Sequence, residues 1–543
     1  MGKICCCDFF VTAFLQIAVL NRFCIFEIQP KLILLYFMKK TTLLIVLCVA
    51  KVLAFAQQKP NIVIIISDDH SYQTIGAYGS TFGHTPNIDR IATAGIRFNK
   101  AYVTNSICGP SRATLLTGKY SHKNGFKDNE TSNFDHSQDL FVKDLQKVGY
   151  KTAWIGKQHL GNEPQGFDYF SVLVGQGHYF NPTFVNANNQ RETVNGYVSD
   201  IVTDKATHWL DSLDKSNPFC LVIGHKATHR TWMPDPQDFG KNDEKEFPLP
   251  ANFYDDYEGR LSAGGQEMSI DKDMQMGYDL KMYNSVAEMK KEGNFSRMND
   301  DQWRKYLAYY KPIKEQLDMK QLSGKALAEW KYRRYMIDYL NTAESMDRNI
   351  GRVLDYLKEH DLEKNTIVIY LSDQGFYMGE HGWFDKRFMY EESFRTPMIA
   401  KFPEMIAKGT VSDAQIMNVD IAPTLLQLAG VKKPQEMQGQ SFVDVLTGKD
   451  KRGRQNLYYH YYENGEHAVS PHFGVSDGRY KLIRFYKRVN SWELYDLTQD
   501  PSEMKNIYAT APAKIVKDLK KKLKREIMKV EDHDALTIFN KKL

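Results

Sequence analysis

Four short apolar runs, each followed closely by polar residues, constrain the fold of this 543-residue chain more than any other feature. The runs cover residues 61–66, 152–155, 219–224 and 365–371. Continuous apolar runs of this length are typical of strands that are buried on both faces of a parallel sheet. Segments predicted as helices lie between them, at 86–92, 140–148, 196–213 and 330–357, with Thr85 as the cap of the first. A further strand is predicted at 98–103. This alternation predicts an α/β fold built on a large, mostly parallel sheet flanked by helices.

The polar residues that follow the four strands are the first candidates for a functional site. They are Asp68, Asp69, Lys157, His159, His229, Asp373 and Gln374. Because ligands of open α/β sheets bind beyond the carboxyl ends of the strands, we expect these side chains to converge. Carboxylate and amide oxygens are ligands suited to Ca²⁺ or Mg²⁺, although acids at strand ends also cap loops.

A second candidate is the stretch 106–118, Ser-Ile-Cys-Gly-Pro-Ser-Arg-Ala-Thr-Leu-Leu-Thr-Gly, which reads as a loop that becomes a helix. Pro110 suits a first helical turn, and the free N–H groups there favour an anion beside Cys108. Arg112 adds a fixed positive group. The alternative is a buried free cysteine in front of an ordinary helix.

Cys108-x-Pro110-Ser111-Arg112, followed by Ala-Thr-Leu-Leu-Thr-Gly-Lys, resembles the signature of the formylglycine-dependent (type I) sulfatases. Residues 156–161, Gly-Lys-Gln-His-Leu-Gly, match a second motif of that family. The resemblance implies an alkaline-phosphatase-like sheet, a Cys108 oxidised to formylglycine (3-oxoalanine) by a sulfatase-maturating enzyme, and one divalent cation, usually calcium, with magnesium possible. The implied metal ligands are Asp68, Asp69, Cys108, Asp373 and Gln374, the last standing where the family often has Asn or His. The implied catalytic residues are Cys108, Arg112, Lys157, His159, His229 and Lys386.

The mechanism that the resemblance implies is transesterification. One hydroxyl of the hydrated residue 108 attacks sulfur with Asp373 as base, and His229, aided by Lys386, protonates the departing alcohol. His159 then removes the proton of the second hydroxyl, so that sulfate leaves and the aldehyde forms again. Thr228 stands before His229 where the family usually has Pro, and His225 is interpreted as structural.

Residues 103–107 and 373–387 resemble N-acetylglucosamine-6-sulfatases of polysaccharide-degrading bacteria. The resemblance implies a sulfated glycan substrate, a glycosaminoglycan or mucin glycan, with Asp385, Arg387 and His472 binding sugar hydroxyls. A surface ion pair is the alternative for Asp385 and Arg387. Three other functions stay open: a sulfatase of another sugar, a phosphate or phosphonate monoester hydrolase, and a non-catalytic glycan-binding relative, which would have lost catalytic residues.

The sequence also predicts how the chain is divided. Residues 1–37 are expected to be an over-extended start, and 38–56 a signal peptide with charged, apolar and Ala-Phe-Ala segments. Residues 57–450 would form the catalytic domain, with a helical insertion at about 235–335, and 451–543 a smaller α+β domain ending in a basic helix. Export to the periplasm or cell surface follows, without a stable membrane span in the mature form. The net charge of +5 argues against a nucleic-acid binder.

Overall fold

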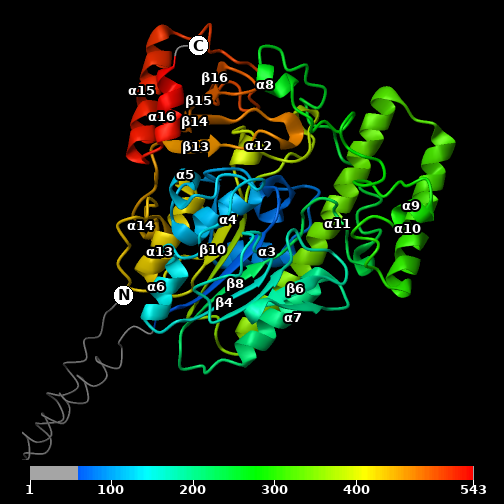
Figure 1. The fold of residues 1–543 in the computed structure, drawn as a ribbon, viewed down its shortest axis with the longest axis horizontal. Coiled ribbons are helices and arrows are strands. Elements are labelled where there is room, and N and C mark those ends of the chain that lie inside the picture. The colour runs from blue at the N-terminus through cyan, green and yellow to red at the C-terminus, as the bar shows by residue number, and fades with distance from the viewer. Residues whose placement is uncertain (1–58, 542–543) are drawn as a thin grey trace, which may run out of the picture. The chain divides into compact units, whose positions relative to one another are not determined.

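A ten-stranded sheet runs through the centre of the structure, a computed structural model in which residues 59–541 are described (Figure 1). The strand order is β11-β2-β10-β9-β1-β8-β4-β5-β6-β7. The strands are β1 (Asn61–Ser67), β2 (Ile96–Phe98), β4 (Lys151–Gly156), β5 (Tyr169–Leu173), β6 (Thr183–Asn186), β7 (Gln190–Thr193), β8 (Phe219–Gly224), β9 (Thr366–Ser372), β10 (Met398–Lys401) and β11 (Thr410–Ser412). Only β6 and β10 run against the others, so the sheet is mixed and mostly parallel, as predicted.

Helices cover both faces of this sheet. One face carries α3 (Pro86–Ala94), α7 (Val198–Asp211) and α11 (Gly324–Glu359), and the other carries α4 (Cys108–Thr117), α6 (Phe141–Lys147) and α13 (Ile421–Leu428). Strand β1 shows why its sequence is continuously apolar: Ile62, Ile64 and Ile66 enter one core, and Val63 and Ile65 enter the other. Burial on both faces therefore confirms the interpretation of the apolar runs.

One predicted strand is divided. The run 98–103 was expected to be a single strand, but the chain leaves the large sheet after β2 and forms β3 (Ala101–Tyr102), which pairs with β12 (Ile416–Met417). At the change the N–H of Asn99 donates to the carbonyl of Ser412 at 2.8 Å. The strand is divided because its two halves pair with different strands of the distant segment 410–417. The sequence of 98–103 alone does not reveal these partners.

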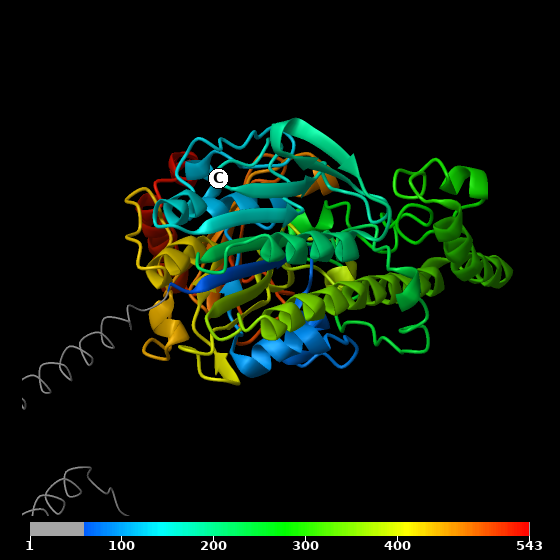
Figure 2. The same ribbon diagram turned by 90° about the horizontal axis from the view of Figure 1, so that it is seen from below.

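The region 235–335 contains helices and loops, and its described residues form no strand. It holds α8 (Leu261–Gly264), α9 (Val286–Met289), α10 (Asp300–Lys320) and the first part of α11. Figure 2 shows α11 extending from the sheet to the other helices of this region. Aromatic rings fill the space between them; Phe239, for example, stacks on Tyr309 with ring centroids 4.3 Å apart.

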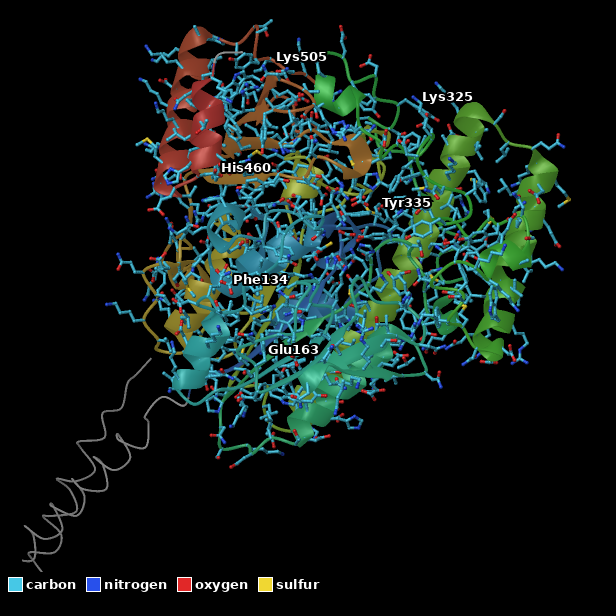
Figure 3. All side chains as sticks on the ribbon, in the orientation of Figure 1. Phe134, Glu163, Lys325, Tyr335, His460 and Lys505 are labelled. Carbon is cyan, nitrogen blue, oxygen red and sulfur yellow. The ribbon has the colours of Figure 1, made fainter. Side chains whose placement is uncertain are left out.

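The C-terminal part has its own antiparallel sheet in the order β13-β14-β15-β16. Its strands are β13 (Leu457–Tyr461), β14 (His472–Ser476), β15 (Tyr480–Phe485) and β16 (Ser491–Asp496), and α15 (Ala513–Lys529) and α16 (His533–Asn540) cover it (Figure 1). His460, labelled in Figure 3, is buried beside Asp532, with Nδ1 2.7 Å from the carboxylate. The remaining short helices are α5 (Ser121–Asn124), α12 (Glu391–Phe394) and α14 (Val443–Leu446).

The predicted N-terminal extension and signal peptide lie outside the described residues. Within residues 59–541, no helix combines the length and the apolar character needed to cross a membrane. The boundary placed at 450/451 stays a prediction.

A buried carboxylate joins α11 to α3. Thr85 was expected to cap α3, but its side chain makes no capping hydrogen bond. Asp347 of α11 instead accepts the backbone N–H of Ile88 at 2.8 Å and that of Asn87 at 3.1 Å. The start of α3 therefore depends on a residue about 260 positions later in the chain.

We expect Asp347→Ala to lower the free energy of unfolding by about 2 kcal/mol, because the buried N–H of Ile88 and the half-buried N–H of Asn87 lose their acceptor. Asp355→Ala is the matched control: Asp355 also joins α11 to α3, but its ion pair with Arg90 is exposed, so its loss should cost about 0.5 kcal/mol or less. Urea denaturation measures both values. Equal losses would contradict the role given to Asp347.

Candidate active site

The polar clusters at the ends of β1, β4, β8 and β9 meet at the start of α4. Cys108 is the first residue of that helix and is 1% exposed. Its Sγ lies 3.2 Å from Oδ1 of Asp68 and 3.6 Å from Nζ of Lys386. The amide nitrogen of Gln374 is 3.7 Å from the same sulfur. Residues from separate segments thus surround one thiol, and burial raises its pKa to about 12.

Two glycines allow the ends of β4 and β8 to approach this closely. A Cβ on Gly156 would lie 2.1 Å from the carbonyl oxygen of Gly224, and one on Gly224 would lie 2.1 Å from that of Lys157. Gly156 also has a φ of +96°, which disfavours any other residue. The segments that carry Lys157 and His229 therefore start side by side.

Three buried carboxylates form the acidic side of the site. One oxygen from each of Asp68, Asp69 and Asp373 lies within 4.8 Å of the others. Burial raises the pKa of Asp69 to about 6, against the opposing effect of Lys386. Oε1 of Gln374 is buried and has no hydrogen-bond partner among residues 59–541. Three carboxylates and an unpartnered amide oxygen fit a hard divalent cation such as Ca²⁺ or Mg²⁺.

Each carboxylate is also paired with one basic side chain. Nε of Arg112 donates to Asp373 at 2.9 Å, and Nζ of Lys386 lies 2.7 Å from both oxygens of Asp69. Lys157 contacts Asp68, and burial lowers the pKa of Lys157 well below the ordinary value. All three basic side chains predicted from the sequence therefore face the acidic cluster.

The side chains beside Lys157 include two residues that were not predicted, Lys226 and Gln176. Lys226 is buried, and its Nζ donates to the carbonyl of Gln176 at 3.1 Å; burial lowers its pKa to about 8. The side-chain oxygen of Gln176 accepts from Lys157 at 2.5 Å. Lys226 stands between the two histidines of 225–229, where its basic character was available as a signal. Gln176 lies in a turn after β5 whose sequence gives no such signal.

Three histidines that follow β4 and β8 differ in position. His229 lines a small pocket beside Cys108, with Nδ1 2.6 Å from the carbonyl oxygen of Arg230 and Nε2 4.0 Å from Asp69. Burial and the nearby lysines lower its pKa well below the ordinary value. His159 is not among the residues lining the pocket, and its Nδ1 is buried without a partner in the described range. His225 is fully buried, which agrees with a structural role.

A pocket with a volume of about 70 Å³ opens above Cys108, and Asp385 and Arg387 line its wall. Burial disfavours the charged form of Asp385, but the neighbouring Arg387 and His467 hold the pKa of Asp385 well below the usual range. Nε2 of His467 lies 2.7 Å from Asp385. The C-terminal histidine that contacts Asp385 is therefore His467, which was not predicted from the sequence.

His472 was expected to lie with Asp385 and Arg387, and the structure does not bring it there. Its side chain is fully buried at the start of β14. Nε2 accepts the N–H of Met389 at 3.1 Å, and Nδ1 lies 2.8 Å from the carbonyl oxygen of Ser470. With both ring nitrogens engaged and the ring stacked on Phe388, His472 cannot contact a ligand in the pocket.

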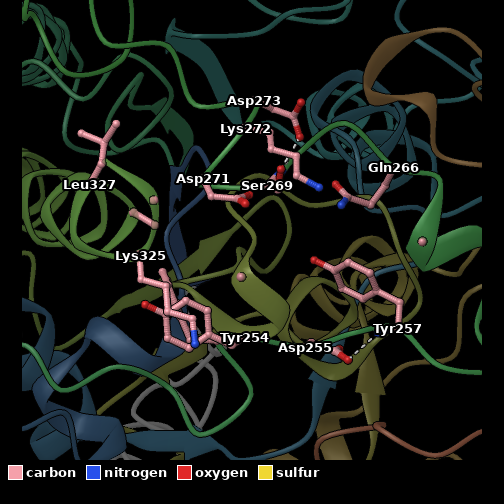
Figure 4. Close-up of a pocket in the computed structure, with 15 residues that line it drawn as sticks. Tyr254, Asp255, Tyr257, Gln266, Ser269, Asp271, Lys272, Asp273, Lys325 and Leu327 are labelled. Atoms are coloured by element: carbon pink, nitrogen blue, oxygen red, sulfur yellow. Dashed lines mark hydrogen bonds between the residues drawn. The ribbon is translucent and has the colours of Figure 1, made fainter. Parts of the chain in front are cut away.

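A larger cavity, of about 520 Å³, lies between residues 253–273 and the start of α11 (Figure 4). Tyr254, Tyr257 and Lys325 are among its lining side chains. None of the residues predicted to be catalytic, metal-binding or sugar-binding lines it. This cavity is thus separate from the site built around Cys108.

Comparison with known protein families gives matches both to the region of the large sheet and to the C-terminal region. A family described as "Sulfatase" matches residues 60–431, and one described as "N-sulphoglucosamine sulphohydrolase, C-terminal" matches residues 379–531. The chain is 45% identical over 491 residues to the "N-acetylglucosamine-6-O-sulfatase" of Bacteroides thetaiotaomicron, covering 88% of each chain.

Two solved structures extend this comparison. One, described as in complex with its substrate D-glucosamine-2-N,6-O-disulfate, has a TM-score of 0.86 and 44% identity, and the alignment covers 89% of this chain and all of that one. The phosphonate monoester hydrolase of Agrobacterium radiobacter has a TM-score of 0.60 at 18% identity, over 87% of this chain and 96% of its own. The second likeness concerns the fold alone.

Proposed function

Because this chain belongs to the sulfatase family, we propose that it removes the 6-O-sulfate from N-acetylglucosamine units of a sulfated glycan, a glycosaminoglycan or mucin glycan. The single observation that supports this most is the 45% identity with an N-acetylglucosamine-6-O-sulfatase over most of both chains. We further propose that the protein is exported by the segment 38–56 to the periplasm or cell surface.

The site depends on two groups that the chain acquires. Asp68, Asp69, Asp373, Gln374 and residue 108 would hold a calcium ion, which supplies positive charge where oxygen charge develops during sulfate transfer. Oxidation of Cys108 to formylglycine by a maturating enzyme would supply a hydrated aldehyde as nucleophile. The donor set and the unpartnered oxygen of Gln374 support the first proposal, and the Cys108 motif supports the second.

The basic side chains bind the sulfate. Arg112, Lys157 and Lys386 now balance three carboxylates one for one. A divalent cation adds two positive charges, so that Lys157 and Lys386 can turn to an anionic ester at the pocket. Lys226 adds a fourth basic group beside them.

The titrating side chains move the protons. Nδ1 of His229 faces the carbonyl of Arg230, which leaves Nε2 directed toward the pocket to protonate the departing sugar oxygen. A bound sulfate opposes the effect of the neighbouring lysines on the pKa of His229 and so favours its charged form. Asp373 acts as base toward residue 108, and His159 accepts the second proton at the end of the cycle.

The sugar is held at the other side of the pocket. Asp385 and Arg387 would present charged groups to its hydroxyls, and their place in the lining of the pocket supports this proposal. His467 replaces His472 as the third member, because its Nε2 lies against Asp385. Glu463 and Tyr461 contact Arg387 from behind and fix its orientation.

The test is sulfate release by protein co-produced with a maturating enzyme. The substrates are 6-sulfated N-acetylglucosamine, 6-sulfated N-acetylgalactosamine, N-sulfated glucosamine and a phosphate monoester. We expect preferential release from the first, and none from Cys108→Ala. Release from another sugar would refute the substrate, and faster phosphate release would refute the reaction.

Calcium should stabilise the protein measurably. We expect its addition to metal-stripped protein at about 100 times the dissociation constant to raise the free energy of unfolding by about 2.7 kcal/mol. Thermal unfolding with and without calcium measures this. Asp69→Asn should abolish the shift, whereas Asp355→Asn, an exposed acid outside the site, should keep it. A shift that survives in Asp69→Asn would place the ion elsewhere.

His467→Ala should raise the KM for 6-sulfated N-acetylglucosamine about tenfold, because Asp385 and the sugar lose a partner worth about 1.4 kcal/mol. His472→Gln is the matched control, since Gln can still accept the N–H of Met389. It should change thermal stability and leave KM near the wild-type value. The opposite pattern would restore His472 as the sugar ligand.

A further inference from the structure

Helix α15 concentrates positive charge. Its residues Ala513–Lys529 include eight Lys or Arg and two Asp or Glu, a net charge of +6, whereas the whole chain carries +5. The rest of the sequence is therefore close to neutral. Such a distribution gives one surface a local potential that the net charge of the chain does not reveal.

The charge lies on one face of the helix. Lys514, Lys517, Lys521, Lys524 and Arg525 are exposed, and we call them the α15 stripe. At about 100° and 1.5 Å per residue they fall within an arc of about 100° and extend over about 16 Å. Leu519, Leu523 and Ile527, on the opposite face, are buried in the C-terminal core. Figure 1 shows α15 lying against the small C-terminal sheet.

The stripe is not neutralised within the protein. None of its five cations forms an ion pair with any residue in the described range 59–541. By contrast, Lys522 on the flank pairs with Asp477 at 2.6 Å, and Lys520 lies over the ring of Trp492 at 4.6 Å. Asp518 is the one acidic side chain at the edge of the stripe.

The spacing of these cations is unfavourable as long as no ligand is bound. Lys517 and Lys521, and Lys521 and Arg525, are four residues apart, a separation at which like charges repel on a helix surface. A bound chain of negative groups would relieve this repulsion and release counterions into solution. The stripe is thus complementary to an extended polyanion.

We propose that the α15 stripe binds a sulfated glycan chain away from the catalytic pocket; the identity of the polymer rests on the proposed function. A membrane surface fits less well, because the apolar face of α15 is already buried in the protein and cannot enter lipid. A single-stranded nucleic acid fits less well too, because the stripe has no aromatic side chain on which bases could stack.

The C-terminal helices are connected to the wall of the pocket. Glu531, between α15 and α16, pairs with Lys123 at 2.6 Å, and Asp534 of α16 pairs with Lys127 at 2.8 Å. Asn129, two residues after Lys127, lines the pocket. A glycan held on the stripe is therefore kept near the site, which raises the local concentration of its sulfated units.

The test measures binding in the Cys108→Ala protein, so that turnover cannot interfere. The stripe variant is K514Q/K517Q/K521Q/K524Q, since Gln and Lys have similar helix propensities. The charge-matched control is K408Q/K432Q/K449Q/K451Q, four exposed lysines elsewhere. The probe is a heparin oligosaccharide of defined length, titrated at several salt concentrations, and circular dichroism verifies that the variants are folded.

We expect the stripe variant to bind the oligosaccharide about tenfold more weakly than the parent, and the control to stay within about twofold of it. The slope of log K against log salt should fall by about 3 in the stripe variant alone. Equal losses in both variants would overturn the proposal. Equally tight binding of desulfated polymer, DNA or anionic vesicles by the parent would also overturn it.

Turnover separates this proposal from the proposed function. With Cys108 present, the stripe variant should hydrolyse the 6-sulfated monosaccharide as fast as wild type and lose rate only on the polymer. If wild type releases sulfate from no N-acetylglucosamine substrate, the proposed function fails, while the binding result still decides whether the stripe holds a sulfated chain.

Discussion

The side chain of Arg112 joins three parts of the protein that are far apart in sequence. It lies one turn after Cys108 on α4; its Nε donates to Asp373 at the end of β9, and its Nη1 donates to the carbonyl of Lys157 at the end of β4. Both charged side chains are at most 1% exposed. Because removing one partner of such a pair strands a buried charge, at a cost of about 3–5 kcal/mol, the position of Cys108 against the sheet depends on this contact.

The site also holds its backbone in unfavourable conformations. Asp69, His159, Asp385 and Arg387 have φ values of +65°, +59°, +76° and +99°, a region that residues other than glycine rarely adopt. The surrounding structure compensates: the hydroxyl of Tyr339, on α11, donates to the carbonyl of Asp69 at 2.7 Å. Extensive burial on both faces of the sheet stabilises the fold enough to hold these backbone conformations.

The predicted insertion, residues 235–335, joins two segments that line the pocket, the loop after β9 and the C-terminal part. The N–H of Phe384 donates to Met268 at 3.0 Å, next to the loop that carries Asp385. The N–H of Glu267 donates to His467 at 2.8 Å, and Nδ1 of His467 lies 2.6 Å from the carbonyl oxygen of Glu267. The insertion therefore connects the two sides that contact Asp385.

The sequence by itself determined the central strands, their burial on both faces and the group of side chains around Cys108, because apolar runs and strand-end residues are local signals. It did not determine which histidine faces Asp385. His472 begins β14, where pairing turns its ring toward Phe388, whereas His467 lies in a turn at φ +56° and contacts Asp385. The cap that Asp347 gives α3 and the contact of Gln176 with Lys157 were likewise decided by the tertiary structure. Each of these two contacts joins segments that are brought together only when the helices and loops pack against the sheet. No local sequence pattern therefore encodes either contact.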